Sequence, residues 1–453
     1  MRQGQPTLLV NATVVTGDGT TIFERGIIRI REGVVTEARE GDSTPAHDEL
    51  IIDANGCTII PGIINAHAHG CTYGPSMPSG SRPFVPEEVT YQKNRHLLSG
   101  TTSLVNVCGL ALPDEINPAG DAHPLQVIIA TAHTPANIEA ALAVDGKGLG
   151  RRHRTARIDD LIAARVRILG EAGGGQTLGG GAQDYRFIPD AIRAATGQEV
   201  HPTAARRLKE AVLGRHLDGV GCADDAGLEL LLSELALGDH LTAIRLRDLV
   251  RETVMPPVEL ALQGLREVAK HSARLRLPAI FHNAVPTAPT LLALARRHPA
   301  ARMIAGHSNH PSFLPEEAVH YARLLRDAGV VIDASTLDCI STRWRNDASN
   351  LDALIEAGLV DTLSTDFAGG DWDSILSAIQ RIVHKGQLPL PAAIALATGN
   401  VARSIPEVAG DRGILAKGKR ADIVVCESHN LARVRHVLIA GRVVVKNGML
   451  LGP

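Results

Sequence analysis

Eight short apolar runs, rich in β-branched residues, recur along the middle of the chain, and a helical pattern follows each of them. The runs are Ile59–Ala66, Thr101–Cys108, Leu125–Ala132, Arg165–Glu171, Leu277–His282, Arg302–His307, Gly329–Ser335 and Val360–Asp366. Strands that alternate with helices form parallel sheets, and eight such units are the number found in a (β/α)8 barrel. A doubly wound open sheet is the alternative, but no Gly-x-Gly-x-x-Gly turn in the right context supports it. We therefore expect an α/β fold with a (β/α)8 TIM barrel over residues 62–403.

Helical patterns between and after these runs fit the same interpretation. They cover Glu87–Ser99, Pro135–Ala143, Thr287–Arg297, Pro315–Asp327, Ser349–Ala357 and Asp371–Val383. Several of them begin after Pro, Ser or Asp and end near Gly, as helix capping predicts. Asp371 and Asp373 are accordingly interpreted as residues that start a helix.

Both ends of the chain are predicted to be β-structure. Short alternating segments separated by glycine turns cover Thr7–Thr16, Gly26–Arg31, Gly33–Glu40, Asp422–Glu427, Val434–Ala440 and Arg442–Val445. Two β-rich ends around a different middle predict one small β-sandwich domain, composed of residues 1–61 and 404–453.

An insertion at about residues 173–256 interrupts the barrel pattern after its fourth strand. A glycine-rich run, Ala172–Gly181, opens it, and helical patterns follow at Thr203–Leu213, Asp225–Leu237 and Val258–Ser272, the last of which we assign to the barrel. The insertion would overhang the active face of a barrel, either as a cover over the substrate or as a surface for oligomer contacts. Tyr185 and Arg186 follow the glycine run and are candidates for substrate binding.

The overall charge and the cysteines limit the kinds of partner that can be expected. A net charge of −3 argues against a nucleic-acid surface or a polybasic membrane patch. No apolar run is long enough to span a bilayer, and the first residues lack a signal-peptide core. The six cysteines are scattered, without a Cys-x-x-Cys pair, as in proteins with reduced thiols. We expect a cytoplasmic homo-oligomer, a dimer or a tetramer, that acts on a small molecule.

Ionisable residues stand directly after the apolar runs, where the strands of a barrel end. They are His67, His69, Glu171, His282, His307 and Asp366. One such residue would be a weak signal, but four histidines and two carboxylates at one end of one barrel are not separate accidents. Buried charges need partners or a metal, and this set has the composition of a two-metal site.

Longer motifs in the chain resemble those of the amidohydrolase superfamily of metal-dependent hydrolases. They are the His-x-His that follows Pro61-Gly62, the later single histidines, Ser364-Thr365-Asp366, Ala397-Thr398-Gly399-Asn400-Val401-Ala402, and the run from Gly413 to Ala421-Asp422-Ile-Val-Val. The last resembles the family's return from the barrel to the β-domain. Enamidase-like enzymes and other cyclic-amide hydrolases are the relatives that this resemblance indicates.

The resemblance implies a division of the ligands between two metal ions. The first ion would be held by His67, His69 and Asp366, and the second by His282 and His307. Many relatives bridge the two ions with a carboxylated lysine on the fourth strand, but no lysine lies near Arg165–Glu171.

Two residues of the chain are candidates for the bridging ligand in place of lysine. Glu171 occupies the fourth-strand position and is similar to the bridging glutamate of some relatives. Cys108, which ends the second strand, is the alternative, because some N-acyl-D-amino-acid deacylases bridge with a cysteine there and thiolate is a good zinc ligand. We prefer Glu171, since carboxylates bridge metals readily and a buried carboxylate needs such a partner.

The implied reaction is hydrolysis of the C–N bond of an amide, expected to be cyclic. A metal-activated hydroxide would attack the carbonyl carbon, with Asp366 as general base and then general acid. Two divalent ions are expected, with zinc preferred and iron or manganese as alternatives. His310 is a further candidate for substrate contact, and Ser335 and Asp338 for the lining of the pocket.

Two other functions stay open at this point. One is a mononuclear aminohydrolase, which deaminates an aminated heterocycle with one metal ion. The other is a non-catalytic scaffold of the same fold. Every ligand position is filled in this sequence, which argues against the scaffold because buried charges without a function are costly.

Overall fold

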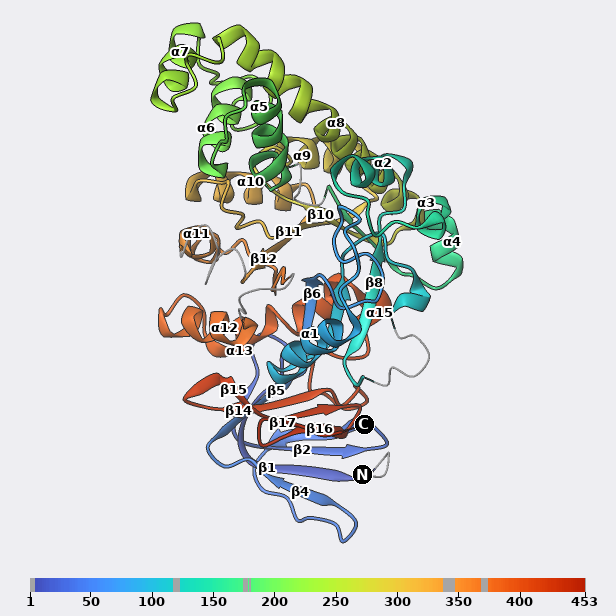
Figure 1. The fold of residues 1–453 in the computed structure, drawn as a ribbon. Coiled ribbons are helices and arrows are strands. Elements are labelled where there is room, and N and C mark those ends of the chain that lie inside the picture. Colours follow the sequence, from blue (N-terminus) through green and yellow to red (C-terminus); the bar gives the residue numbers. More distant parts are fainter. Residues whose placement is uncertain are drawn as a thin grey trace.

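The computed structural model describes residues 5–116, 123–173, 178, 181–336, 347–367 and 374–452. Figure 1 shows three parts along the molecule: a sheet formed by both chain ends at the bottom, a barrel in the middle and a helical insertion at the top. In the described part of the chain, no helix is both long and apolar enough to cross a membrane.

The middle part is a parallel barrel whose eight strands follow one another in chain order. They are β6 (Ile63–Ala68), β7 (Thr101–Asn106), β8 (Gln126–Thr131), β9 (Ile168–Ala172), β10 (Pro278–His282), β11 (Arg302–Gly306), β12 (Val331–Ser335) and β13 (Thr362–Ser364). Nearly all of their residues are buried, as expected for parallel strands covered by helices outside and side chains inside. The predicted (β/α)8 barrel is confirmed.

Hydrogen bonds just beyond β13 join the last strand to the first. The amide of Asp366 donates to the carbonyl of His67 at 2.9 Å, and the amide of His69 donates to the carbonyl of Phe367 at 2.8 Å. The backbone contact that closes the barrel therefore also brings His67, His69 and Asp366 together.

The apolar run Ile59–Ala66 forms two strands rather than the single predicted one. β5 (Cys57–Pro61) pairs with a strand of the terminal sheet, whereas β6 begins the barrel at Ile63. Gly62 lies between them, where a Cβ atom would come within 2.2 Å of the Thr102 hydroxyl oxygen. Glycine thus lets the chain pass from one sheet to the other in one residue. Periodicity did not divide the run into two strands, because both halves are buried and apolar.

Helices cover the barrel, and the six predicted ones are present. They are α1 (Pro86–Leu98), α2 (Pro135–Val144), α9 (Ala288–Arg297), α10 (Pro315–Asp327), α11 (Ser349–Glu356) and α12 (Ile375–His384). Shorter elements are η1 (Pro113–Glu115), α3 (Arg151–Thr155), α4 (Ile158–Ala163), α13 (Leu390–Ala395), α14 (Gly399–Ser404) and α15 (Pro406–Ala409). Asp371 and Asp373, predicted to start α12, lie outside the described residues.

The two chain ends form one nine-stranded sheet. Its strands are β1 (Thr7–Val15), β2 (Ile22–Arg31), β3 (Val34–Glu40), β4 (Leu50–Asp53), β5, β14 (Ile423–Glu427), β15 (Asn430–Ile439), β16 (Arg442–Lys446) and β17 (Met449–Leu450). Pairing of β5 with β14 joins the two ends in antiparallel register. The predicted β-domain from both termini is confirmed.

The insertion between β9 and β10 is helical. It contains the π-helical turn η2 (Gln183–Phe187), α5 (Ile188–Thr196), α6 (Pro202–Leu213), α7 (Asp225–Glu234) and the first part of α8 (Ala243–Leu275). The helix predicted at Val258–Ser272 therefore begins at Ala243 and passes through Pro256 and Pro257. Its earlier turns bury an apolar face that includes Leu246 and Val250, which offsets the cost of about 3 kcal/mol for proline inside a helix.

Candidate metal centre

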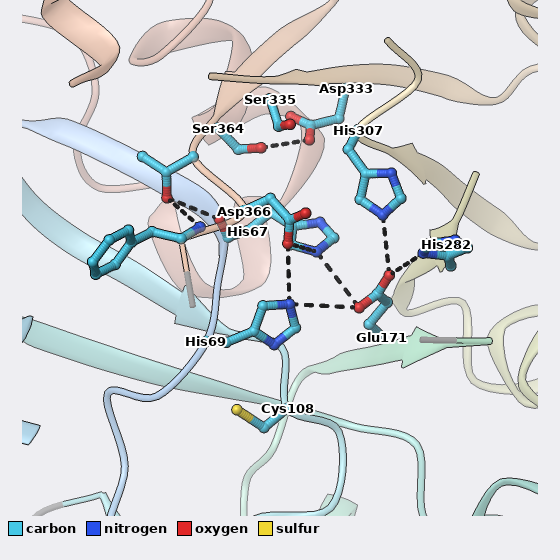
Figure 2. Close-up of polar contacts among 12 residues, drawn as sticks. His67, His69, Cys108, Glu171, His282, His307, Asp333, Ser335, Ser364 and Asp366 are labelled. Carbon is cyan, nitrogen blue, oxygen red and sulfur yellow. Dashed lines mark hydrogen bonds and ion pairs between the residues drawn. The ribbon is translucent and has the colours of Figure 1, made fainter. Parts of the chain in front are cut away.

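The six predicted ligand residues meet at the C-terminal end of the barrel, as Figure 2 shows. Each comes from the end of a strand or the residues just after it: His67 and His69 from β6, Glu171 from β9, His282 from β10, His307 from β11 and Asp366 from β13. All except Asp366 are at most 5% exposed. Residues up to 299 positions apart in the sequence (366 − 67) thus form one buried cluster.

Glu171 lies at the centre of this cluster and faces two pairs of histidines. Its Oε1 atom is 3.1 Å from Nδ1 of His282 and 3.2 Å from Nε2 of His307. Its Oε2 atom is 3.6 Å from Nε2 of His67 and 3.7 Å from Nε2 of His69. The two oxygens of one carboxylate therefore face different histidine pairs.

Asp366 contacts the pair formed by His67 and His69. Its Oδ1 atom is 3.1 Å from Nε2 of His69 and 3.4 Å from Nε2 of His67. The Asp366 side chain is 20% exposed, compared with 3% for that of Glu171. Asp366 is thus the acidic member of the cluster that reaches the space open to a substrate.

The donor atoms fit divalent cations. Those of His67, Glu171 and His307 lie within 4.8 Å of one another, as do those of His67, His69 and Asp366. Both ring nitrogens of His67 are buried without a hydrogen bond. Buried nitrogen and oxygen donors at such spacing are a suitable set for zinc, iron or manganese.

The surroundings of His282 support the same conclusion. Its Nε2 atom is 2.5 Å from the carbonyl oxygen of Leu178, and because a carbonyl only accepts, this nitrogen carries the proton. The other nitrogen, Nδ1, faces Glu171 and is left available to a cation. A backbone carbonyl that fixes the protonated nitrogen is the usual outer partner of a metal-binding histidine.

Both carboxylates are ionised at neutral pH. Burial by itself would raise the pKa of Glu171, but the His67 imidazole and the contacts with His282 and His307 hold it well below its usual range. Burial also opposes ionisation of Asp366, yet the hydrogen bond with His69 and the charge of His67 lower its pKa to about 2. The cluster therefore offers two anionic groups to bound cations.

The local backbone conformation orients several of the ligand side chains. His307 and Asp366 have φ angles of 36° and 49°, in the left-handed region that residues other than glycine adopt rarely, mainly at turns and functional sites. Gly306 precedes His307, and a Cβ atom there would be 2.8 Å from Nδ1 of His67. The sequence needs glycine at this position so that the His67 ring can lie against strand β11.

Cys108 lies beside the cluster but belongs to neither ligand group. Its thiol donates a hydrogen bond to the carbonyl of Ser76 at 2.8 Å and accepts one from the amide of Gly70 at 3.4 Å. In Figure 2 its sulfur points away from Glu171. Cys108 thereby fastens the turn that follows His69.

His310, the candidate substrate residue on the barrel, lies beside two of the ligand histidines. The His310 ring lies 5.5 Å from those of His282 and His307, centre to centre, and its Nδ1 contacts the Ser312 hydroxyl at 2.8 Å. Burial, together with the charges of these two histidines, holds the pKa of His310 well below its usual range.

The two candidates from the insertion lie in the π-helical turn η2. Tyr185 is 47% exposed, and the Arg186 guanidinium stacks on the Phe187 ring at 4.8 Å. Ser335 is buried at the end of β12, and Asp338 lies outside the described residues.

Asp333 is a buried acid that sequence reasoning missed. It lies inside β12 and accepts hydrogen bonds from the hydroxyls of Thr362 at 2.6 Å and Ser364 at 2.7 Å, both on β13. Burial raises its pKa, although these hydroxyls and the charge of His67 oppose the shift. The sequence did contain a signal for Asp333, namely an acidic residue inside the otherwise apolar run Gly329–Ser335.

Comparison with known proteins adds the family. The family model described as the Amidohydrolase family matches residues 280–444. Adenine deaminase 2 of Agrobacterium fabrum is 39% identical over 83 residues, which are 18% of this chain and 13% of the deaminase. The curated relative is thus matched over a small part of its length.

Solved structures match over the whole chain. The β-aspartyl dipeptidase of Fervidobacterium islandicum has a TM-score of 0.56 at 16% identity, and the match covers 100% of this chain and 99% of the dipeptidase. A D-hydantoinase has a TM-score of 0.55 at 16% identity, and the match covers 98% of this chain and 96% of the hydantoinase. At these identities the likeness is one of fold.

A closed barrel with four histidines and two carboxylates at its C-terminal end is the architecture of a barrel enzyme with a metal site. The match of residues 280–444 to the Amidohydrolase family, together with the fold shared with these structures, agrees with the superfamily that the sequence motifs resemble.

Proposed function

We propose that this protein hydrolyses the C–N bond of an amide, a cyclic one by preference, with two divalent metal ions. The position of Glu171 carries the proposal, because its two oxygens face different histidine pairs. A carboxylate in that position is suited to bridge two ions. The same geometry favours Glu171 over Cys108 as the bridge, since the Cys108 thiol is engaged with the carbonyl of Ser76.

The proposed ligands divide between the two ions in the same way as the contacts among these side chains. His67, His69 and Asp366 would hold the first ion, and His282 and His307 the second, with Glu171 shared. Bound zinc, or iron or manganese in its place, would activate a water molecule and polarise the substrate carbonyl.

Asp366 is the proposed general base and general acid. Its side chain contacts His69 and His67 through Oδ1 and is also the most exposed of the six ligand residues. It can accept a proton at the cluster and deliver it to a departing nitrogen on the substrate side. His310, beside His282 and His307, is the proposed substrate contact from the barrel.

The insertion over residues 173–256 is the proposed cover of the site, with Tyr185 and Arg186 as its candidate substrate contacts. Arg215, two residues after the end of α6, supports this. Its guanidinium donates to the Ser312 carbonyl at 2.7 Å and to Glu317 at 2.8 and 2.9 Å. Because Ser312 also contacts His310, the insertion is fastened to the loop that carries the proposed substrate contact. We also propose a homo-oligomer.

A mononuclear deaminase is the second candidate function. The similarity to adenine deaminase 2 over 83 residues favours it. One metal ion held by the His67, His69 and Asp366 group would be sufficient for this reaction.

Metal analysis and a substrate panel separate the two functions. Purified protein dialysed against zinc should contain two ions per chain and should hydrolyse lactams, dihydropyrimidines or N-acyl amides. About one ion per chain, with ammonia released from an aminopurine or aminopyrimidine, would replace the amidase proposal with the deaminase.

A further inference from the structure

An open pocket lies at the N-terminal end of the barrel, where strands β11, β12 and β13 begin. Its wall includes Arg302 at the start of β11, Val331 at the start of β12, Asp361 just before β13, and Asn400 and Arg403 on α14. Its volume is about 640 Å³, within the range of about 300–1,000 Å³ that is usual for small-molecule sites. The pocket is therefore large enough to hold a small organic molecule.

This pocket is separate from the candidate metal centre. Arg302 begins β11, whereas the ligand residue His307 directly follows the end of that strand. Five residue steps of a strand, at about 3.3 Å each, put their Cα atoms roughly 16 Å apart. Ile304, between them on the strand, is buried in an apolar cluster together with Ile64 and Val401. A molecule in the pocket would therefore not compete with a substrate at the metal ions.

Positive charge exceeds negative charge among the described residues that line the pocket, which include three arginines and one acid. Nη2 of Arg326 lies 2.9 Å from Oδ1 of Asp361, and Arg302 is paired with Glu407. Arg403 has no acidic partner in the described part of the chain. One guanidinium of the pocket is thus left without a matching negative charge.

Hydrogen bonds hold the Arg403 side chain in place. Its Nη2 donates to Oδ1 of Asn400, and Nδ2 of Asn400 donates to the carbonyl oxygen of Asp361 at 2.9 Å. Because an arginine side chain carries five N–H donors, this single hydrogen bond leaves donors for a bound anion. Asn400 belongs to the motif Ala397–Ala402, which contributes no side chain to the metal centre.

Another part of the wall is apolar and reaches solvent. Pro299 and Ala300 are exposed, and Ala301 and Val331 are partly buried. An apolar group placed against these residues would remove their surface from water. The pocket therefore suits a molecule that carries both an anionic group and an apolar part.

We propose that this pocket is a second binding site, for a small organic anion whose carboxylate or phosphate group pairs with Arg403 and whose apolar part lies against Ala301 and Val331. The negative charge of the ligand would complete the charge balance of the pocket. Guanidinium groups favour such contacts because their planar donors match both kinds of anion. The site does not depend on the reaction at the metal centre, so it can fail or succeed separately from the proposed amide hydrolysis.

Titration of the zinc-loaded full-length protein with matched small molecules, followed by NMR signals of the probes, tests the site. Pentanoate and butyl phosphate should bind. 1-Pentanol has the same chain as pentanoate without the charge, and it should bind at least about tenfold more weakly. Inorganic phosphate, which lacks the apolar part, should bind at least about tenfold more weakly than butyl phosphate. Either order of pentanoate and butyl phosphate supports the pocket and identifies the preferred anion.

Two arginine substitutions form a matched pair for these titrations. Arg403→Gln removes the unmatched charge and should weaken the binding of both anions at least about tenfold. Arg323→Gln removes an exposed arginine of α10 that does not line the pocket and should leave both unchanged. Ala300→Glu places an acid on the exposed wall and should also weaken the binding of the anions, with the Arg403 contacts intact.

Several results would overturn the proposal. One is equal binding of 1-pentanol and pentanoate, and another is anion binding by Arg403→Gln that matches that of Arg323→Gln. Displacement of pentanoate by acetohydroxamate, which chelates the proposed metal ions, would put the anion at the metal centre. Inorganic phosphate that binds as tightly as butyl phosphate would refute an organic ligand. Should Arg403→Gln fail to fold, unchanged anion binding by Ala300→Glu refutes the pocket by itself.

Discussion

Replacement of Glu171 by glutamine tests the centre of the proposed metal site. The substitution keeps the shape of the side chain and one of its oxygens but turns the other oxygen into an amide nitrogen, which cannot bind a cation. Because Oε1 faces His282 and His307 while Oε2 faces His67 and His69, one histidine pair loses its oxygen ligand. We expect Glu171→Gln to bind about one metal ion per chain where the wild type binds two.

The loss should also appear in the free energy of unfolding. An ion present at 100 times its dissociation constant stabilises the folded state by about 2.7 kcal/mol. Glu171→Gln should lose a contribution of this size for the vacated position. Metal content by mass spectrometry after dialysis and unfolding with and without a chelator measure both quantities.

Cys108→Ser serves as the contrast, because the Cys108 thiol contacts the carbonyl of Ser76 and the amide of Gly70 but belongs to neither ligand group. This variant should retain two ions per chain. Two ions bound with unchanged affinity by Glu171→Gln, or one ion lost from Cys108→Ser, would refute the assignment of Glu171 as the bridge.

Three further substitutions examine other parts of the molecule. Asp366→Asn should lower kcat by a factor of about 10²–10⁴, since it removes the proposed proton carrier; steady-state kinetics that match the wild type would exclude Asp366 from the mechanism. Gly306→Ala should weaken metal binding, because its Cβ would be 2.8 Å from the His67 ring; unchanged affinity in a metal titration would contradict the close approach. Burial by itself would raise the pKa of Asp352, but hydrogen bonds, led by that from Arg381, hold it well below its usual range. This carboxylate therefore stabilises the fold above its unfolded pKa of about 3.9 and loses that contribution as the pH falls further. Asp352→Asn should lower the Tm at pH 7 but show a smaller difference at pH 3, and an equal difference at both pH values would refute this origin.

The barrel could be predicted because its strands carry the signal themselves. Parallel strands buried on both faces are continuous apolar runs, and most of them are followed by a helical pattern, often with proline in its first turn. The end of each strand marks the same side of a barrel, so His67, His69, Glu171, His282 and Asp366 could be assigned to one place without coordinates.

Boundaries that depend on neighbouring elements were less accessible. The predicted domains meet between residues 61 and 62, but the single apolar run Ile59–Ala66 does not show that it forms two strands, with a glycine between them where a side chain would meet Thr102. The start of α8 at Ala243 was missed because Pro256 and Pro257 predict a break. Burial of Leu246 and Val250 outweighs that local preference.

The sequence by itself determined the fold class and the composition of the site, because strand periodicity and residue type are local properties of the chain. Only the tertiary structure decided how the ligand residues divide into two groups within the site. The separation of the Glu171 oxygens between two histidine pairs and the hydrogen bond of the Cys108 thiol to the Ser76 carbonyl depend on distances between strands and helices. Those distances are fixed by the packing of segments far apart in the chain, which no local pattern records.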